Sequence, residues 1–390
     1  MYKLHSAAAA VVLAGGISAA VPAYAGSYKV VYDFQGGTTD AAEVVGGLLK
    51  VGNMLYGTSY AGGTAGKGTV YSVTPAGVET VIYSFQGGSD GAGPYSALIN
   101  VDGVLYGTTT LGGATNVGTI FNITTAGVEK VLYAFQGNFI NNDGANPQGG
   151  LVKAGAMLYG TTAGGDPQDA GTVFQITPAG VYTQICHFRG GLAPDGPVAS
   201  LIPYKGQLMG TTFIGGGSNF GSVFEMTHDG VFKTIHSFGG SSDIADPAAN
   251  MINVGGTFYG TAQSGGASEF GGVYSITPAG VETVLYQFTG VGVDGGGPAA
   301  GLINVDGTFY GVTGTGYNKN GYFSSTLFSI TPAGVLTTLH SFGTGKETSA
   351  PRPMSVMKTL TTMARIGRSM KWCVRRMGAP CVSRKGRVLF

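Results

Sequence analysis

The stretch VLYGTTTLGGATNVGTIF at residues 104–121 returns 53 residues later as MLYGTTAGGDPQDAGTVF at residues 157–174. Markers of this unit recur at spacings of 50 to 54 residues, among them a phenylalanine that precedes a glycine-rich loop. These phenylalanines are Phe34, Phe85, Phe135, Phe188, Phe238, Phe288 and Phe342. Self-similarity at a fixed period is typical of repeat architectures. The sequence therefore predicts six complete repeats, and a lone strand at residues 27–34 that begins a partial seventh.

Turn residues divide each repeat into four short strands. In the second copy, ALINV and VLYGTT flank Asp102 and Gly103, and Asp-Gly between apolar runs is a strong signal for a two-residue hairpin. A glycine-rich loop leads to TIFNIT, and TAGV (elsewhere TPAGV) forms a second tight turn before EKVLYAF. We label these strands a to d and expect them to form an antiparallel meander.

The strands carry apolar or aromatic residues on both faces, as in GTVYSVT at residues 68–74. Strands covered on both faces imply sheets stacked against each other. The fold class predicted for residues 26–345 is therefore all-β, a β-propeller of four-stranded antiparallel blades. A β-solenoid is the alternative, although its parallel pairing does not suit the Asp-Gly hairpins.

Both termini differ from the repeats. Residues 1–25 combine Lys3, an alanine-rich apolar run and AYA before Gly26, the pattern of a secretory signal peptide. We therefore expect a secreted or cell-surface protein. No later segment is apolar for 18 residues, so no membrane span is expected.

The segment 346–390 contains 11 Lys and Arg with one Glu, whereas residues 26–345 have a net charge of −10. Three interpretations of this tail remain: a shifted reading frame, a genuine and poorly ordered basic interaction tail, or a basic helix for a membrane surface. We expect that it does not complete a seventh blade. We also expect no nucleic-acid partner, because export separates the chain from nucleic acid and the body lacks a basic patch.

The unit LYGTT..GG.....GTVF.ITPAGVE.VLY.F.GG.DG..P...LI.VDG resembles the GloVer repeat of bacterial extracellular choice-of-anchor proteins. The resemblance covers residues 27–345. It implies export and surface display, and it brings no catalytic residues.

Reaction motifs are absent from the sequence. It has no Gly-x-Ser-x-Gly, no His-Glu-x-x-His and no Gly-Lys-Ser/Thr, and its three cysteines form neither a disulfide framework nor a zinc-finger spacing. His236 and His340 replace a tyrosine of strand d, which indicates packing. We expect no catalytic residue and a non-enzymatic, monomeric module that binds an extracellular glycan or protein. A propeller-type lyase or hydrolase, with acids from several blades, is the alternative.

The connections from strand d to the next strand a repeatedly carry an aspartate. These residues are Asp90, Asp143, Asp195, Asp243 and Asp294. They suit Asx-turns, in which a carboxylate accepts nearby backbone N–H groups. The alternative is a ring of carboxylates near the axis that binds a polar ligand or Ca²⁺, and no other cofactor is expected. Four further side chains on the loop-rich face suit glycan or protein contact: Phe139, Asn141, Tyr317 and Asn318.

Overall fold

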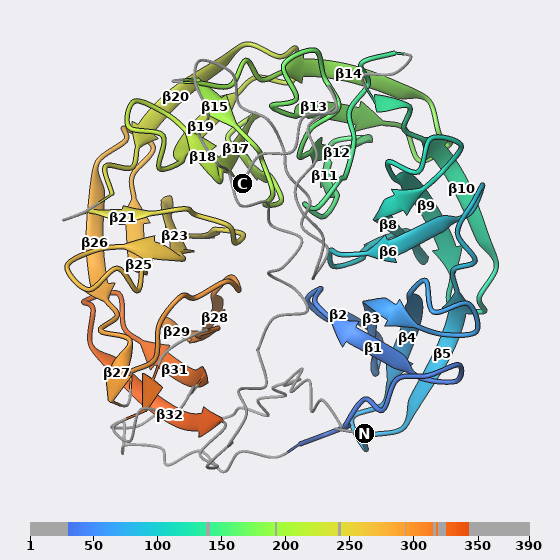
Figure 1. Ribbon diagram of the computed structural model, residues 1–390, viewed down its shortest axis with the longest axis horizontal. Coiled ribbons are helices and arrows are strands. Elements are labelled where there is room, and N and C mark those ends of the chain that lie inside the picture. Colours follow the sequence, from blue (N-terminus) through green and yellow to red (C-terminus); the bar gives the residue numbers. More distant parts are fainter. Residues whose placement is uncertain are drawn as a thin grey trace, which may run out of the picture. The chain divides into compact units, whose positions relative to one another are not determined.

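The computed structural model describes residues 30–137, 141–191, 193–240, 243–292, 294–314, 317–318 and 325–342. The chain divides into two units, Met1–Thr348 and Ser349–Phe390, and all described residues lie in the first. Six four-stranded antiparallel blades follow one another around a ring, as Figure 1 shows. The chain is therefore an all-β propeller, and the prediction of the fold class is confirmed. Among the described residues, no helix has the length and apolar character needed to cross a membrane.

The blades are numbered 1 to 6 in chain order, and each pairs its strands in the order a-b-c-d. The a strands are β2 (Leu49–Val51), β7 (Ile99–Val101), β11 (Val152–Ala154), β16 (Ile202–Tyr204), β22 (Ile252–Val254) and β28 (Ile303–Val305). The b strands are β3 (Met54–Gly62), β8 (Val104–Gly112), β12 (Met157–Thr162), β17 (Gln207–Thr212), β23 (Thr257–Ala262) and β29 (Thr308–Val312).

The c strands are β4 (Thr69–Val73), β9 (Thr119–Thr124), β13 (Thr172–Ile176), β19 (Ser222–Met226), β25 (Gly272–Ile276) and β31 (Ser325–Ile330). The d strands are β5 (Glu79–Ser84), β10 (Glu129–Ala134), β14 (Tyr182–His187), β20 (Phe232–Ser237), β26 (Glu282–Gln287) and β32 (Leu336–Phe342). In Figure 1 the d strands β5, β10, β14, β20 and β26 lie at the rim.

The repeated letters are explained by contacts between strands b and c. Gly107 of β8 pairs with Phe121 of β9, and a Cβ on Gly107 would lie 2.7 Å from the Phe121 ring. The glycine of YGT thus leaves room for the aromatic ring of the next strand. Thr109 and Thr119 join the same two strands through their hydroxyl groups at 2.8 Å. The opening stretch therefore encodes a matched pair of strands.

The two ends of each blade differ. At one end lie the a–b hairpins, such as Asp102-Gly103 with φ of 53° and 88°, and the c–d turns. In all six c–d turns a threonine hydroxyl accepts the N–H of the valine four residues later. The other end bears the b–c and d–a connections. Short strands join them there: β1 (Ala41–Val44), β6 (Gly91–Pro94), β15 (Pro194–Asp195) with β18 (Ile214–Gly215), β21 (Ile244–Ala245) with β24 (Ser264–Gly265), and β27 (Val291–Gly292) with β30 (Tyr317–Asn318).

A lone strand was expected at residues 27–34, but the described part of this segment, residues 30–34, has no strand conformation. The reason is that a d strand needs a free c strand beside it, and every described c strand already pairs with the d strand of its own blade. The segment nevertheless packs on blade 1, where the Phe34 ring lies 5.0 Å from the Tyr71 ring. The expectations for residues 1–25 and 346–390 fall outside the described residues.

Candidate functional site between blades 4 and 5

A β-bulge in every d strand positions the side chains between blades. The pairing of β20 with β19 shifts register between Phe224 and Val223, which leaves Ile235 unpaired. Such a bulge re-aims the neighbouring side chains. The next residue, His236, thereby faces blade 5 and packs edge-on against Phe238, with ring centroids 4.9 Å apart.

In blades 1, 2, 4 and 5 the residue after the bulge lies beside the aspartate of the following d–a connection. In three blades it is a tyrosine whose hydroxyl donates to that aspartate: Tyr83 to Asp90 at 3.0 Å, Tyr133 to Asp143 at 2.6 Å, and Tyr286 to Asp294 at 3.2 Å. The first residue of the next blade's strand d completes the group. We call each such set of three residues an inter-blade cluster.

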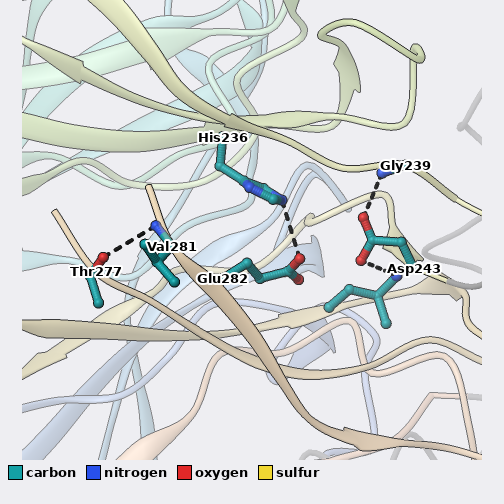
Figure 2. Close-up of polar contacts among 7 residues, drawn as sticks. His236, Gly239, Asp243, Thr277, Val281 and Glu282 are labelled. Atoms are coloured by element: carbon teal, nitrogen blue, oxygen red, sulfur yellow. Dashed lines mark hydrogen bonds and ion pairs between the residues drawn. The ribbon is translucent and has the colours of Figure 1, made fainter. Parts of the chain in front are cut away.

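Between blades 4 and 5 the inter-blade cluster consists of His236, Asp243 and Glu282 (Figure 2). The His236 Nε2 atom lies 3.2 Å from Glu282 Oε2, an ion pair whose orientation is not that of a hydrogen bond. Asp243 accepts the N–H of Gly239 at 2.6 Å and that of Ile244 at 2.8 Å. Glu282 directly follows the turn in which Val281 donates to Thr277 (Figure 2). Three elements thus fix three potential ligand side chains.

Burial and charge oppose each other in this cluster. Burial raises the pKa of Glu282 and the nearby Asp243 raises it further, while His236 lowers it, and the net pKa is raised. Burial lowers the pKa of His236, but the adjacent Glu282 carboxylate, together with the charge of Asp243, outweighs the effect of burial, so this pKa is also raised. The three ligand atoms lie within 4.8 Å of one another, and among the described residues this is the one group of three His, Cys, Asp or Glu side chains so arranged.

The predicted aspartates occupy two kinds of place. Asp90, Asp143, Asp243 and Asp294 accept backbone N–H groups of their own connections. Asp40 of the first connection, which the sequence analysis omitted, also accepts the N–H of Ala41, at 2.7 Å. Asp90, Asp143 and Asp294 also contact a tyrosine that follows the bulge of a d strand, so these carboxylates lie beside the d strands.

Asp195 stands two positions later than the others. The backbone carbonyl of Ala193 accepts the N–H of Gly216, just as the backbone carbonyl of Asp90 accepts the N–H of Gly113. Ala193 therefore holds the position in its connection that Asp90 holds in the earlier one. Asp195 instead lies with Asp166 and Asp169 of the b–c loop of blade 3, and it is 8% exposed. None of the described residues donates a hydrogen bond to its carboxylate. Burial, together with the charges of Asp166 and Asp169, raises the pKa of Asp195 to about 7.

Asn141 belongs to the connection that follows β10, whereas Tyr317 and Asn318 belong to the connection between β29 and β31. Asn141 is exposed and donates to the side chain of Gln136 at 3.1 Å. Tyr317 and Asn318 form β30, whose backbone pairs in parallel with β27. Phe139 lies outside the described residues. Binding by these residues stays a prediction.

The sequence analysis missed His236 and Glu282 as partners. It interpreted His236 as a packing residue, and the ring does pack, but its Nε2 atom also faces two carboxylates. One signal was available: the glutamate of GVE begins strand d at Glu79, Glu129 and Glu282, whereas other copies have Tyr182, Phe232 or Leu336. A carboxylate that recurs where apolar residues also fit indicates a polar environment.

The repeat matches a known family. The model of the Gloeobacter/Verrucomicrobia repeat matches residues 14–219 and 154–369. The chain belongs to this family. The resemblance to GloVer repeats is thereby confirmed, and the repeat family accounts for the whole described propeller. No curated protein matches the sequence.

Several solved structures resemble the repeat protein. A putative 6-phosphogluconolactonase from Bacteroides uniformis is 15% identical with a TM-score of 0.48, over 83% of this chain and 86% of that one. An ulvan lyase is 8% identical with a TM-score of 0.49, over 78% and 86%. A gluconolactonase from Xanthomonas campestris is 11% identical with a TM-score of 0.42, over 77% and 90%. Likeness of this degree carries no inference about activity.

Proposed function

We propose that this repeat protein is an exported, non-enzymatic binding module for an extracellular glycan or protein. The observation that carries the proposal is the difference between the two ends of the blades. The c–d turns repeat one hydrogen-bond pattern six times, whereas the b–c and d–a connections differ from blade to blade. Variable loops on a rigid scaffold are where binding usually resides.

The aspartates favour a non-catalytic role. Asp90 and Asp143 each accept backbone N–H groups and a tyrosine hydroxyl, and these hydrogen bonds occupy most of the lone pairs that a general base needs free. The same groups also fix the conformation of their loops. Calcium binding at these connections stays a prediction.

One observation favours the alternative, a propeller-type carbohydrate-active enzyme. Asp195 is buried beside Asp166 and Asp169, and its pKa is raised to about 7. A carboxyl group with such a pKa suits a general acid near neutral pH, as in glycoside hydrolysis. This group is the one we would test for catalysis.

Two measurements separate the proposals. The purified protein is applied to a glycan array and to a panel of extracellular proteins, and it is incubated with polysaccharides to detect new reducing ends or unsaturated products. We expect retention without turnover. Turnover that disappears in Asp195→Asn would overturn the non-enzymatic proposal.

A matched pair of variants locates the binding face. Phe220, 40% exposed in the b–c loop of blade 4, and Val281, 63% exposed in a c–d turn, are apolar side chains at opposite ends of the blades. We expect Phe220→Ala to weaken ligand retention by about tenfold, the effect of removing roughly 1.4 kcal/mol of contact, and Val281→Ala to leave it unchanged. The reverse result would place binding on the other face.

A further inference from the structure

The inter-blade cluster of His236, Asp243 and Glu282 differs from its counterparts in the kind of atom that it presents. Where Tyr83 or Tyr286 follows the bulge, a hydroxyl donates to the aspartate and completes its hydrogen bonding. His236 places an imidazole nitrogen there instead, beside two carboxylates. An imidazole with two carboxylates is a donor set suited to transition metals.

Buried polar atoms in this cluster lack hydrogen-bond partners. His236 Nε2 and Glu282 Oε1 are shielded from solvent and make no hydrogen bond. The Tyr274 hydroxyl likewise has no hydrogen-bond partner, on a side chain that is 0% exposed, and burial, followed by the charge of Glu282, raises the pKa of this phenol. Unpaired buried polar atoms are costly and call for an explanation, such as a bound ion.

We propose that His236, Asp243 and Glu282 bind one divalent transition-metal ion of the zinc class between blades 4 and 5. His236 contributes Nε2, and each carboxylate contributes an oxygen. Ligand atoms on one Zn²⁺ lie about 3.4 Å apart, because each is about 2.1 Å from the ion. The His236 and Glu282 atoms already lie at 3.2 Å, and the whole set lies within 4.8 Å. A small rotation of the carboxylates brings all three to the ion, and water fills the remaining position.

Such a site would tie two blades together. His236 belongs to β20 of blade 4, Glu282 to β26 of blade 5, and Asp243 to the connection between them. A bound divalent ion would balance the two carboxylates in a half-buried place. Because the ion would bind the folded protein alone, it would raise the melting temperature by mass action.

The repeat itself supplies the test variants. His236→Tyr installs the residue found at Tyr83, Tyr133 and Tyr286, so the fold should tolerate it, while the nitrogen ligand is lost. Glu282→Gln removes one carboxylate with little change of shape. His340→Tyr is the matched control, since it makes the same change at the same place in β32.

The experiment is a calorimetric titration of the full chain, first stripped with a chelator, with ZnCl₂. We expect one zinc to bind with an affinity lowered at least tenfold in His236→Tyr and in Glu282→Gln but retained in His340→Tyr. Zinc should also raise the melting temperature of the wild type and of His340→Tyr alone, and equimolar CaCl₂ should not compete. No binding, unchanged affinity in His236→Tyr and Glu282→Gln, or equal competition by calcium would overturn the proposal.

Discussion

At the residue scale, two half-buried glutamates determine the charge at the blade interfaces. Glu79 and Glu129 begin their d strands with one carboxylate oxygen each buried and unpartnered. Burial, followed by the charge of Asp40 for Glu79 and of Asp90 for Glu129, raises the pKa of both groups to about 7. Each glutamate is therefore neutral over much of the acidic range.

The raised pKa values predict how stability changes with pH. In the folded protein these glutamates keep a proton that the unfolded chain, with an ordinary value of 4.5, has already released. The contribution of the two glutamates to folding stability is fully present below about pH 4.5 and is lost as the pH rises through about 7. The double variant Glu79→Gln with Glu129→Gln should therefore melt about 1–2 °C higher than the wild type at pH 8, discounted for partial exposure, and no higher at pH 4.

Thermal melts followed by circular dichroism between pH 4 and pH 8 provide the measurement. Glu269→Gln, at an exposed loop position, is the control and should leave the curve unchanged at every pH. A difference between wild type and double variant that does not depend on pH would show that the two glutamates titrate alike in the folded and unfolded states.

At the scale of elements, each blade is joined to the next by a bulge and a turn. The bulge residue of strand d turns its carbonyl toward the glycine of the following blade's c–d turn. A Cβ on Gly280 would lie 2.0 Å from the carbonyl oxygen of Ile235, and a Cβ on Gly127 would lie 2.7 Å from that of Ile82. The turn glycine is therefore needed for close approach as well as for its φ.

Gly280 and Gly307 allow the cost of a steric clash between blades to be distinguished from the cost of a positive φ. Gly280 and Gly307 have φ of 83° and 82°, but no atom lies within 4 Å of a Cβ built on Gly307. Alanine at either position has the same backbone strain, so Gly280→Ala should lower the free energy of unfolding by about 1–3 kcal/mol more than Gly307→Ala. Urea unfolding of the two variants measures this difference. An equal decrease in the free energy of unfolding for both variants would mean that the blade interface accommodates the added methyl group without an energetic penalty.

At the scale of the whole molecule, the phenylalanine that directly follows strand d in each of blades 1 to 5 packs on the c-strand aromatic ring of the next blade. The ring centroids lie 5.1 Å apart for Phe85 and Phe121, and 5.4 Å apart for Phe135 and Phe174. Phe34 makes the same contact with Tyr71 at 5.0 Å. Val31 likewise faces Gly77, whose Cβ would lie 2.2 Å from the Val31 carbonyl oxygen. Residues 30–34 thus occupy the place of a preceding strand d without pairing as a strand.

This placement predicts that the N-terminal segment stabilises blade 1. Phe34 is 8% exposed and Phe135 is 0% exposed. Phe34→Ala should lower the free energy of unfolding by about 3–4 kcal/mol, close to the cost of Phe135→Ala, because both leave a cavity between blades. Chemical denaturation of both variants tests this. A cost below about 0.5 kcal/mol for Phe34→Ala alone would show that the segment does not complete the interface.

Sequence reasoning predicted the repeat, the four strands and the turns because each depends on neighbouring residues. The Asp102-Gly103 hairpin and the TPAG turns need particular backbone angles that only certain residues adopt, and apolar runs between them mark the strands. The aspartates were also recognised as turn residues. Asp195 was grouped with them wrongly, because counting positions does not show which carbonyl or N–H a residue meets.

The sequence by itself determined the family, the all-β propeller class and the boundaries of the repeated unit, since these follow from periodic local patterns. Only the tertiary structure brought His236 to Glu282 across two blades and Asp195 to the loop of Asp166 and Asp169. The reason is physical: a bulge of one residue reverses the face on which a side chain lies, and the interfaces join residues about fifty positions apart. Neither effect leaves a mark in the local sequence.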